Sequence, residues 1–533
     1  MTEFDYIIVG AGSAGCVLAH RLSAHPGTDV LLLEAGGRDS SPLIGIPKGF
    51  GKLLGDPRFV WHHPVEPLGP ARKVEHWVRG RTLGGSSAVN GMVYNRGHQA
   101  DYDALVRLGN PGWGWDAMLP VFKTIEDHQL GGSELRGAGG PLHISTAPAP
   151  EPLCEDVIAA GRALGWRRAD DLNAGDDERI GYTMATIRNG RRVSSAQAFL
   201  HPVRGRSNLT VSVHSEVTKV LIEHGRAVGV RVRRGGTESE IRTRQEVILS
   251  TGSIATPRLL QLSGIGPAET LKSAGVETLV DSPFVGGRMR EHRCFVVQYR
   301  LADDLGYNRL LSTPPRQVLS AARYLTTRRG PLAAPAFDIA GFFRTTSEPA
   351  RPDAQLLVAP YSLAPEVPGK VPEVEREPGI LGLGYVLRPT SEGSVHITSA
   401  DPEVPPVITA NYFRSAYDRT VGASLFRTMR KLFESGPIAD RIVAETLPGP
   451  SVRSDEDIVN AAMEHGRCGY HAVSTCAMGP DEKDVVDSRL RVRGVRALRI
   501  VDCSVMPTMV SGNLNAPVMA MAWRAADLIL DRH

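Results

Sequence analysis

Six residues near the start of the chain, Gly-Ala-Gly-Ser-Ala-Gly at 10–15, have the spacing that binds the pyrophosphate of a dinucleotide. Gly10 permits a tight turn, Gly12 lets the backbone approach a phosphate, and Gly15 lets a helix pack against a strand. The amino end of that helix offers free N–H groups to the phosphates. Glu34 follows at about 20 residues, where a carboxylate accepts a hydrogen bond from a ribose hydroxyl. The spacing predicts a nucleotide site that includes Ser13, Ala14, Glu34 and Ala35.

The apolar runs predict a strand at 6–9, a helix at 14–23 and a second strand at 29–34. These three elements would position the glycine turn. Such a unit has parallel strands and a right-handed crossover. A glycine turn without a ligand is the alternative, but the strand, the helix and the terminal glutamate are all present. The motif does not distinguish FAD from NAD. Because it occurs once, with no second copy for a nicotinamide, we expect a resident flavin.

The rest of the chain alternates between segments with strand-like patterns and a segment rich in proline. Residues 208–249 mix β-branched and charged residues, which predicts strands that return to the first sheet. Residues 302–376 are rich in proline and include an amphipathic piece at 316–329. Alternation resumes at 379, which predicts an antiparallel sheet, and an alanine-rich helix is expected at 518–531.

This order predicts an α/β protein with a Rossmann-like FAD-binding domain, built from discontinuous segments, and an inserted α+β substrate domain that carries an antiparallel sheet. The length of 533 residues supports two or three domains or subdomains. We assign residues 1–155, 195–300 and 455–533 to the FAD-binding domain, and residues 156–194 and 301–454 to the substrate-binding domain.

Composition excludes several classes of protein. Lys and Arg total 61 against 58 acidic residues, and no basic stripe is interleaved with aromatic residues, so we expect no nucleic-acid partner. The six cysteines form no CxxC pair, which predicts neither a metal site nor a disulfide framework and is typical of the cytoplasm. The amino terminus lacks a signal-peptide pattern, and no apolar run approaches the ~20 residues of a transmembrane segment. We therefore expect a cytoplasmic protein.

Several longer segments resemble one family. Residues 80–97, GRTLGGSSAVNGMVYNRG, resemble the first signature of the glucose–methanol–choline (GMC) oxidoreductases, and residues 252–266 resemble the second. Further matches lie at 110–115, 387–395 and 501–507. The resemblance extends from residue 5 to the final helix, and the chain is most similar in appearance to bacterial choline dehydrogenase-like and hydroxymethylfurfural oxidase-like members.

The resemblance implies a set of FAD contacts. Val217 is expected to contact adenine through its backbone, with plain sheet core as the alternative, and Asp502 to lie near the ribityl and phosphate groups. Val89 stands where some members carry a histidine that attaches FAD, so we expect a non-covalent flavin. The other expected contacts are Arg81, Gly84, Gly85, Ser86, Asn90, Gly91, Met92, Val93, Gly252, Ala516 and Pro517.

The resemblance also implies a catalytic pair. His471 matches the family's active-site histidine, and Asn515 matches the position of its partner. Hydride leaves a carbinol carbon readily only as the hydroxyl proton is removed, and an imidazole suits that base role. An amide at Asn515 donates to the substrate oxygen without competing for its proton. Tyr470 and Met92 are expected to line the substrate pocket.

One stretch departs from the family pattern. Residues 285–292 carry Arg288 and Glu291 where Asn and Asp are usual, a change expected to bear on the substrate rather than on the fold. His292 at the end of this stretch and His465 are expected to be core or surface residues.

These matches imply the oxidation of a primary alcohol to an aldehyde, with hydride transfer to flavin N5 and reoxidation by dioxygen or a quinone-like acceptor. The alternative is an enzyme like the hydroxynitrile lyases, which keep FAD but cleave cyanohydrins without net redox chemistry. A flavin-binding protein with a decayed site is a third hypothesis, against which the intact His471 and Asn515 argue.

Overall fold

The computed structural model describes residues 3–147, 150–365 and 373–531. Its first sheet contains five parallel strands in the order β11-β2-β1-β14-β25. Their bounds are β1 (Glu3–Val9), β2 (Val30–Leu33), β11 (Leu209–Ser212), β14 (Thr237–Leu249) and β25 (Leu498–Ile500). Strands β12 (Glu216–Glu223) and β13 (Arg226–Arg234) continue the sheet as an antiparallel extension of β14. The prediction that residues 208–249 return to the first sheet is confirmed.

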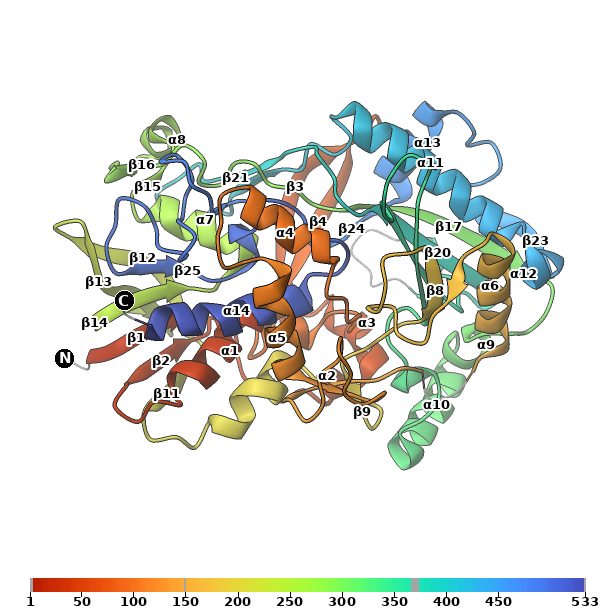
Figure 1. The fold of residues 1–533 in the computed structure, drawn as a ribbon, viewed down its shortest axis with the longest axis horizontal. Coiled ribbons are helices and arrows are strands. Elements are labelled where there is room, and N and C mark those ends of the chain that lie inside the picture. Colours follow the sequence, from red (N-terminus) through yellow and green to blue (C-terminus); the bar gives the residue numbers. More distant parts are fainter. Residues whose placement is uncertain (1–2, 148–149, 366–372, 532–533) are drawn as a thin grey trace.

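The predicted strand–helix–strand unit is present as β1, α1 (Ser13–Leu22) and β2. Every residue of β2 is buried, as a continuous apolar strand requires when both faces of a parallel sheet are covered. The final helix, α14 (Asn515–Leu530), packs along α1 (Figure 1). Ala520, Ala522 and Ala526 on α14 are fully buried, and their small side chains allow the two helices to approach closely.

The second sheet has the order β23-β17-β20-β19-β18-β8-β7, with β24 also paired to β17, and only its β7–β8 pair is parallel. Its strands are β7 (Arg167–Arg168), β8 (Arg179–Tyr182), β17 (Arg293–Leu301), β18 (Ile339–Phe343), β19 (Ala354–Ala359), β20 (Gly379–Val386), β23 (Ile442–Leu447) and β24 (Arg467–Cys468). Helix α11 (Ala416–Phe433) covers one face. A Cβ at Gly384 would lie 2.5 Å from Met429 Sδ of this helix, so the glycine permits the close packing.

The domain boundaries need one correction. Strands β17 and β24, from residues 293 and 467, belong to the second sheet, whereas the prediction placed both segments in the FAD-binding domain. The sheet to which β17 belongs is set by strands distant in the sequence, since β17 pairs antiparallel with β20, β23 and β24. The segment 195–300 therefore leaves the first domain near residue 292, and part of 455–533 contributes to the second sheet.

The remaining elements surround these sheets. The other α-helices are α2 (Pro42–Gly45), α3 (Phe50–Leu53), α4 (Gln99–Arg107), α5 (Trp115–Ile125), α6 (Pro152–Ala163), α7 (Gly252–Leu262), α8 (Ala268–Ser273), α9 (Asn308–Leu311), α10 (Pro314–Thr327), α12 (Gly436–Arg441) and α13 (Asp455–His465). Short strands pair as β3 (Val60–Leu68) with β4 (Lys73–Gly80), β5 (Glu126–His128) with β6 (Leu142–Ile144), β9 (Ile187–Arg188) with β10 (Arg191–Arg192), β15 (Ile265–Gly266) with β16 (Val280–Asp281), and β21 (Ser394–His396) with β22 (Val407–Thr409). Among the described helices, none combines the length and apolar character that crossing a membrane demands.

Candidate active site

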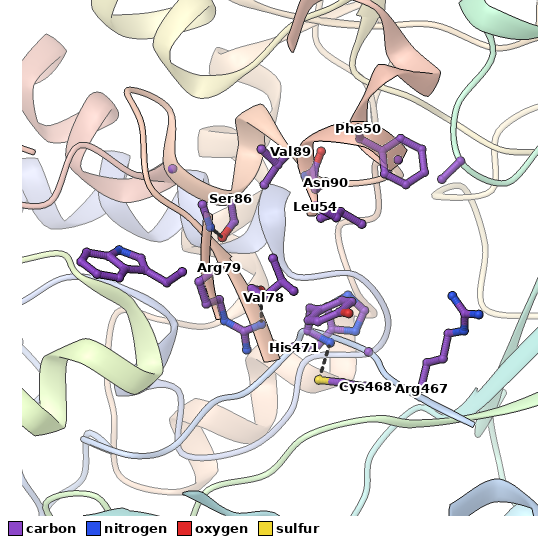
Figure 2. A pocket seen from close by; sticks show the side chains of 18 of the residues that line it. Phe50, Leu54, Val78, Arg79, Ser86, Val89, Asn90, Arg467, Cys468 and His471 are labelled. Carbon is purple, nitrogen blue, oxygen red and sulfur yellow. Dashed lines mark hydrogen bonds between the residues drawn. The ribbon is translucent and has the colours of Figure 1, made fainter. Parts of the chain in front are cut away.

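A cavity of about 1640 Å³ reaches from the glycine turn after β1 to His471. The carboxyl ends of the parallel strands contribute one part of its wall, and one face of the second sheet contributes another. Figure 2 shows His471 and Arg79 on one side, with Phe50, Leu54 and Asn90 across from them. The volume exceeds the roughly 300–1,000 Å³ of a typical small-molecule pocket, so a dinucleotide and a substrate fit together.

The glycine turn presents bare backbone to this cavity. Gly10 has a φ of +97°, and a Cβ on Gly15 would lie 1.9 Å from the Gly10 carbonyl oxygen, so both positions require glycine. A Cβ at Gly12 would have its nearest neighbour at 3.9 Å, so phosphate oxygens have room there. No described side chain caps the amino end of α1, which leaves its first N–H groups for an anion.

The 80–97 segment packs directly on this turn. Gly84 donates its backbone N–H to the Ala11 carbonyl at 2.8 Å, and a Cβ on Gly85 would lie 2.7 Å from Gly12 Cα. The glycines of the segment therefore allow two backbones to meet beside the cavity. Together with the cavity volume and the uncapped helix, these contacts fit FAD.

Two buried carboxylates, Glu34 and Asp502, accept hydrogen bonds from the chain beside this part of the cavity. Glu34 accepts hydrogen bonds from the backbone N–H groups of Ala11 and Gly36, and burial raises its pKa to about 7. Asp502 accepts from the N–H of Gly252 at 2.9 Å and from the Thr256 hydroxyl at 2.6 Å. Both carboxylates also line the cavity, where each can accept a hydrogen bond from a ribose or ribityl hydroxyl.

Most of the predicted cofactor residues line the cavity: Gly10, Gly12, Ser13, Ala14, Glu34, Ala35, Gly85, Ser86, Asn90, Gly91, Met92, Val93, Val217, Gly252 and Asp502. Five do not line it: Gly15, Arg81, Gly84, Ala516 and Pro517. Gly15 packs under the turn, and the Arg81 guanidinium lies 4.0 Å from the ring centroid of Trp61. Ala516 and Pro517 are buried in the first turn of α14. These five therefore support the wall rather than form it.

His471 lies in a chain of hydrogen bonds between two other side chains. Its Nε2 is 3.2 Å from Asn513 Nδ2, and its Nδ1 is 2.8 Å from Nδ1 of His292. Nε2 of His292 is 3.1 Å from the Leu387 carbonyl oxygen, which can only accept. His292 therefore donates from Nε2 and accepts at Nδ1, so His471 carries its proton on Nδ1, and its unprotonated Nε2 accepts the hydrogen bond from Asn513.

The orientation of Asn513 supports this tautomer. The amide nitrogen of Gln355 donates to its Oδ1 at 3.3 Å, and the Tyr385 hydroxyl, 3.4 Å from Oδ1, shares its one proton between Oδ1 and the nearer Gln355 Oε1 at 2.9 Å. The amide oxygen is thus held by donors, and its NH₂ group points at His471. Burial holds the pKa of His471 well below 6.5, with the neighbouring His292 and Arg79 acting in the same direction. Burial also lowers the pKa of His292 to about 4, so both rings are neutral at neutral pH.

Asn515, the predicted partner of His471, lines the same cavity but forms its side-chain hydrogen bond with another residue. It is the first residue of α14, and its Oδ1 accepts a hydrogen bond from the Ser13 hydroxyl at 2.8 Å. This bond joins the amino ends of α14 and α1. The structure therefore places Asn513 in the position that the sequence assigned to Asn515, because the helix start directs the Asn515 side chain toward the glycine turn.

Glu291 and Arg79 also belong to the site, although the sequence assigned neither of them a role in it. Glu291 is buried and accepts hydrogen bonds from the backbone N–H of His471 at 2.6 Å and of His292 at 2.8 Å. Its second oxygen lies 3.4 Å from Nη2 of Arg79, which lines the cavity. Burial raises the pKa of Glu291, while the Arg79 guanidinium opposes this shift. Glu291 thus holds both histidines in place, and the departure from the family pattern at 285–292 was the signal that could have found it.

The remaining predictions for this region have mixed outcomes. Tyr470 and Met92 line the cavity, as expected of substrate-pocket residues, and the Tyr470 ring lies 5.6 Å from the Arg79 guanidinium carbon. His292 is not an ordinary core residue, since it contacts His471 directly. Arg288 forms an ion pair with Asp484 at 3.1 Å and is not part of the cavity wall. Among the described residues, no group of three or more His, Cys, Asp or Glu side chains is arranged to hold a metal ion.

Comparison with known proteins identifies the family. The model of the GMC oxidoreductases matches residues 4–294 and 389–522. An alcohol dehydrogenase [acceptor] of Pseudomonas putida is 37% identical over 99% of this chain and 96% of its own length. The mitochondrial choline dehydrogenase of Mus musculus is 37% identical over 99% of this chain and 89% of its own. The solved structure of pyridoxine 4-oxidase from Mesorbium loti superimposes with a TM-score of 0.88 and 32% identity over 100% of both chains. The chain therefore belongs to the GMC oxidoreductase family, and it is an FAD-dependent enzyme that oxidises alcohols, as the sequence resemblance predicted.

Proposed function

We propose that the protein oxidises a neutral, largely apolar primary alcohol to the aldehyde, with His471 as the base and Asn513 as the hydrogen-bond donor to the substrate oxygen. The observation that carries this proposal is the unprotonated Nε2 of His471 at the cavity wall, where it accepts a hydrogen bond from the NH₂ group of Asn513. FAD, when bound by the residues that line the glycine turn, supplies the hydride acceptor at N5 and passes electrons to dioxygen or a quinone-like acceptor.

The two side chains divide the work on the substrate hydroxyl. A bound hydroxyl donates its proton to Nε2 of His471 and accepts a hydrogen bond from Asn513 Nδ2, so its oxygen develops negative charge as the proton leaves. The His471 ring becomes positive in this step. Its Nδ1–H already donates to Nδ1 of His292, and this hydrogen bond stabilises that charge, while the Leu387 carbonyl orients the His292 ring. His292 and Glu291 are therefore positioning residues.

The low pKa of His471 predicts the pH dependence of the reaction. The base acts only when neutral, so activity is lost as the pH falls through its pKa. Because burial and nearby positive charge lower that pKa below 6.5, we expect kcat/KM for an uncharged alcohol to stay constant from neutral pH to below 6.5. A pH profile of flavin reduction, taken with flavin absorbance as the check on integrity, measures this. An acid limb centred at 6.5 or above would contradict the buried, neutral base.

The substrate class follows from one face of the second sheet. Residues at alternate positions of adjacent strands point into the cavity, and this wall is largely apolar. Its apolar members are Cys294 and Val296 of β17, Leu357 of β19, and Leu381 and Leu383 of β20, and its polar members are Gln298 of β17 and Tyr385 of β20. None of these is a carboxylate, and the glutamates that line the cavity, Glu34, Glu216, Glu373, Glu375 and Glu464, lie outside this wall. The charged group closest in the hydrogen-bond network of His471 is the Arg79–Glu291 pair, in which the cation faces the cavity. A quaternary ammonium ion needs a carboxylate and aromatic faces, so this wall favours a neutral alcohol.

A matched pair of alcohols tests the substrate class. Choline and 3,3-dimethylbutan-1-ol have the same shape but differ in charge, so the comparison isolates the charge of the wall. We expect the neutral alcohol to reduce the flavin anaerobically with a kcat/KM at least about tenfold higher, as one unfavourable charge contact would give. Faster reduction by choline would contradict the neutral-substrate assignment. A flavin that stays oxidised with every alcohol, while a cyanohydrin is cleaved, would support the lyase hypothesis instead.

The proposal also includes a non-covalent flavin and a cytoplasmic location. The first is supported by Val89 and the second by the cysteines. Val89 lines the cavity and has no nucleophilic atom, which supports a non-covalent flavin. The six cysteines are free, and five of them are buried. Unpaired cysteines fit a reducing compartment, which supports a cytoplasmic location.

A further inference from the structure

Helix α10 has an inverted pattern of exposure. Its three large aliphatic side chains, Val318, Leu319 and Leu325, are 69%, 70% and 62% exposed. The residues that it buries fully are Ser320 and Tyr324. A helix that packs on a soluble core normally buries its aliphatic face and exposes its polar one. The apolar face of α10 is therefore directed at something outside this chain.

The charged residues in the segment that contains α10 are all positive. Between residues 305 and 337 the sequence contains five arginines and no Asp or Glu, whereas the whole chain has a net charge of only +3. Arg309 is paired with Asp304. The other four are Arg316, Arg323, Arg328 and Arg329, and none of them forms an ion pair with a residue that the structure describes. The apolar face thus has four uncompensated positive charges on the same helix and its carboxyl-terminal end.

A lipid surface matches this combination better than a second copy of the chain does. In a symmetric dimer through α10, the arginines of the two copies would approach one another and repel. An anionic bilayer accepts both features, because aliphatic side chains enter the boundary between headgroups and acyl chains while guanidinium groups bind phosphates. We propose that α10 is a peripheral membrane contact, with Val318, Leu319 and Leu325 inserted into a bilayer of anionic phospholipid and the arginines on its headgroups.

The position of the helix connects this surface to the active site. In Figure 1, α10 projects from the body of the molecule beside α9. Leu311 of α9, with Pro314, Gln317 and Ala321 of α10, lines the cavity that contains His471. One side of α10 therefore borders the cavity while its aliphatic face points outward. An apolar alcohol or a quinone dissolved in the bilayer would be held at high concentration beside the cavity wall.

Vesicle flotation of the FAD-loaded protein tests the proposal without any turnover. We expect binding to vesicles of equal parts phosphatidylcholine and phosphatidylglycerol, little binding to phosphatidylcholine alone, and release by high salt. The double variant Val318→Asn with Leu319→Asn should abolish binding. The double variant Arg316→Glu with Arg323→Glu should weaken it by about tenfold or more, since each arginine near an anionic surface is worth roughly fivefold.

The matched control replaces two equally exposed aliphatic residues outside α10. Val74 on β4 and Val443 on β23 are 65% and 63% exposed, and the double variant Val74→Asn with Val443→Asn should bind vesicles as the unmodified protein does. Absence of binding by the unmodified protein, equal binding to both vesicle types, or an equal loss in the control would each overturn the proposal. Dissociation of a soluble oligomer by the α10 variants, without vesicle binding, would assign the face to self-association. Because no alcohol is added, failure of the proposed oxidation leaves this result unaffected.

Discussion

Replacing His471 by alanine is expected to lower the rate of anaerobic flavin reduction by about 10²- to 10⁴-fold while the protein keeps its FAD. The physical reason is the loss of the unprotonated ring nitrogen at the cavity wall that accepts the hydroxyl proton. The glycine turn and the carboxylates that brace it do not depend on His471. FAD content, measured as the flavin that denaturation releases from the chain, should therefore stay near that of the unmodified protein.

The control for this variant is His465→Ala. His465 also lines the cavity, but it is exposed and lies at the end of α13, outside the hydrogen-bond chain of His471. Its replacement should leave flavin reduction within about threefold of the original rate, as for most surface changes. A His471→Ala protein that reduces flavin at the original rate, or that loses its flavin, would remove the base role from this residue.

Local patterns of the chain account for the part of the fold that was predictable. The turn around Gly10 and the helix after it depend on steric rules within a few residues, and α1 and β2 lie within one residue of the predicted positions, while β1 begins three residues earlier than predicted. The final helix begins three residues earlier than expected, at Asn515 rather than 518. Alternating patterns also predicted the antiparallel sheet that β20 joins.

The contacts that build the catalytic centre have no local pattern. Strand β24 has only two residues, and its pairing of Cys468 with Arg293 of β17 brings residues about 180 positions apart into register. This register places His292 beside His471, and the backbone N–H of Gly469 donates to the His292 carbonyl. A two-residue strand gives no periodicity to detect. For that reason, neither the contact of His292 with His471 nor the pairing of β17 in the second sheet was predictable from local patterns.

The choice between two asparagines failed for a related reason. Asn513 and Asn515 are two residues apart in the same motif, and sequence similarity alone does not show which one faces the histidine. The geometry separates them, because Asn515 begins α14 and accepts from Ser13, whereas Asn513 precedes the helix and reaches Nε2 of His471.

The variants Asn513→Ala and Asn515→Ala are therefore expected to have different effects. Loss of the Asn513 amide removes a donor to the substrate oxygen, and the rate of flavin reduction should fall by about 10²- to 10³-fold, which corresponds to about 2.7–4 kcal/mol. FAD content should not change. Loss of the Asn515 amide leaves the Ser13 hydroxyl without its acceptor at the glycine turn, so this variant should bind FAD more weakly while its loaded fraction reduces flavin at nearly the original rate.

A third variant, Asn513→Asp, distinguishes a direct contact from a general structural role. A carboxylate at this position would lie next to Nε2 of His471 and stabilise the protonated ring, so the pKa of His471 should rise. The acid limb of the pH profile should then move to higher pH than in the unmodified protein, and the same substitution at Asn515 should leave it in place. If Asn515→Asp moved that limb and Asn513→Asp did not, the partner of His471 during the reaction would be Asn515, because only a carboxylate in contact with the ring can shift its titration in this way.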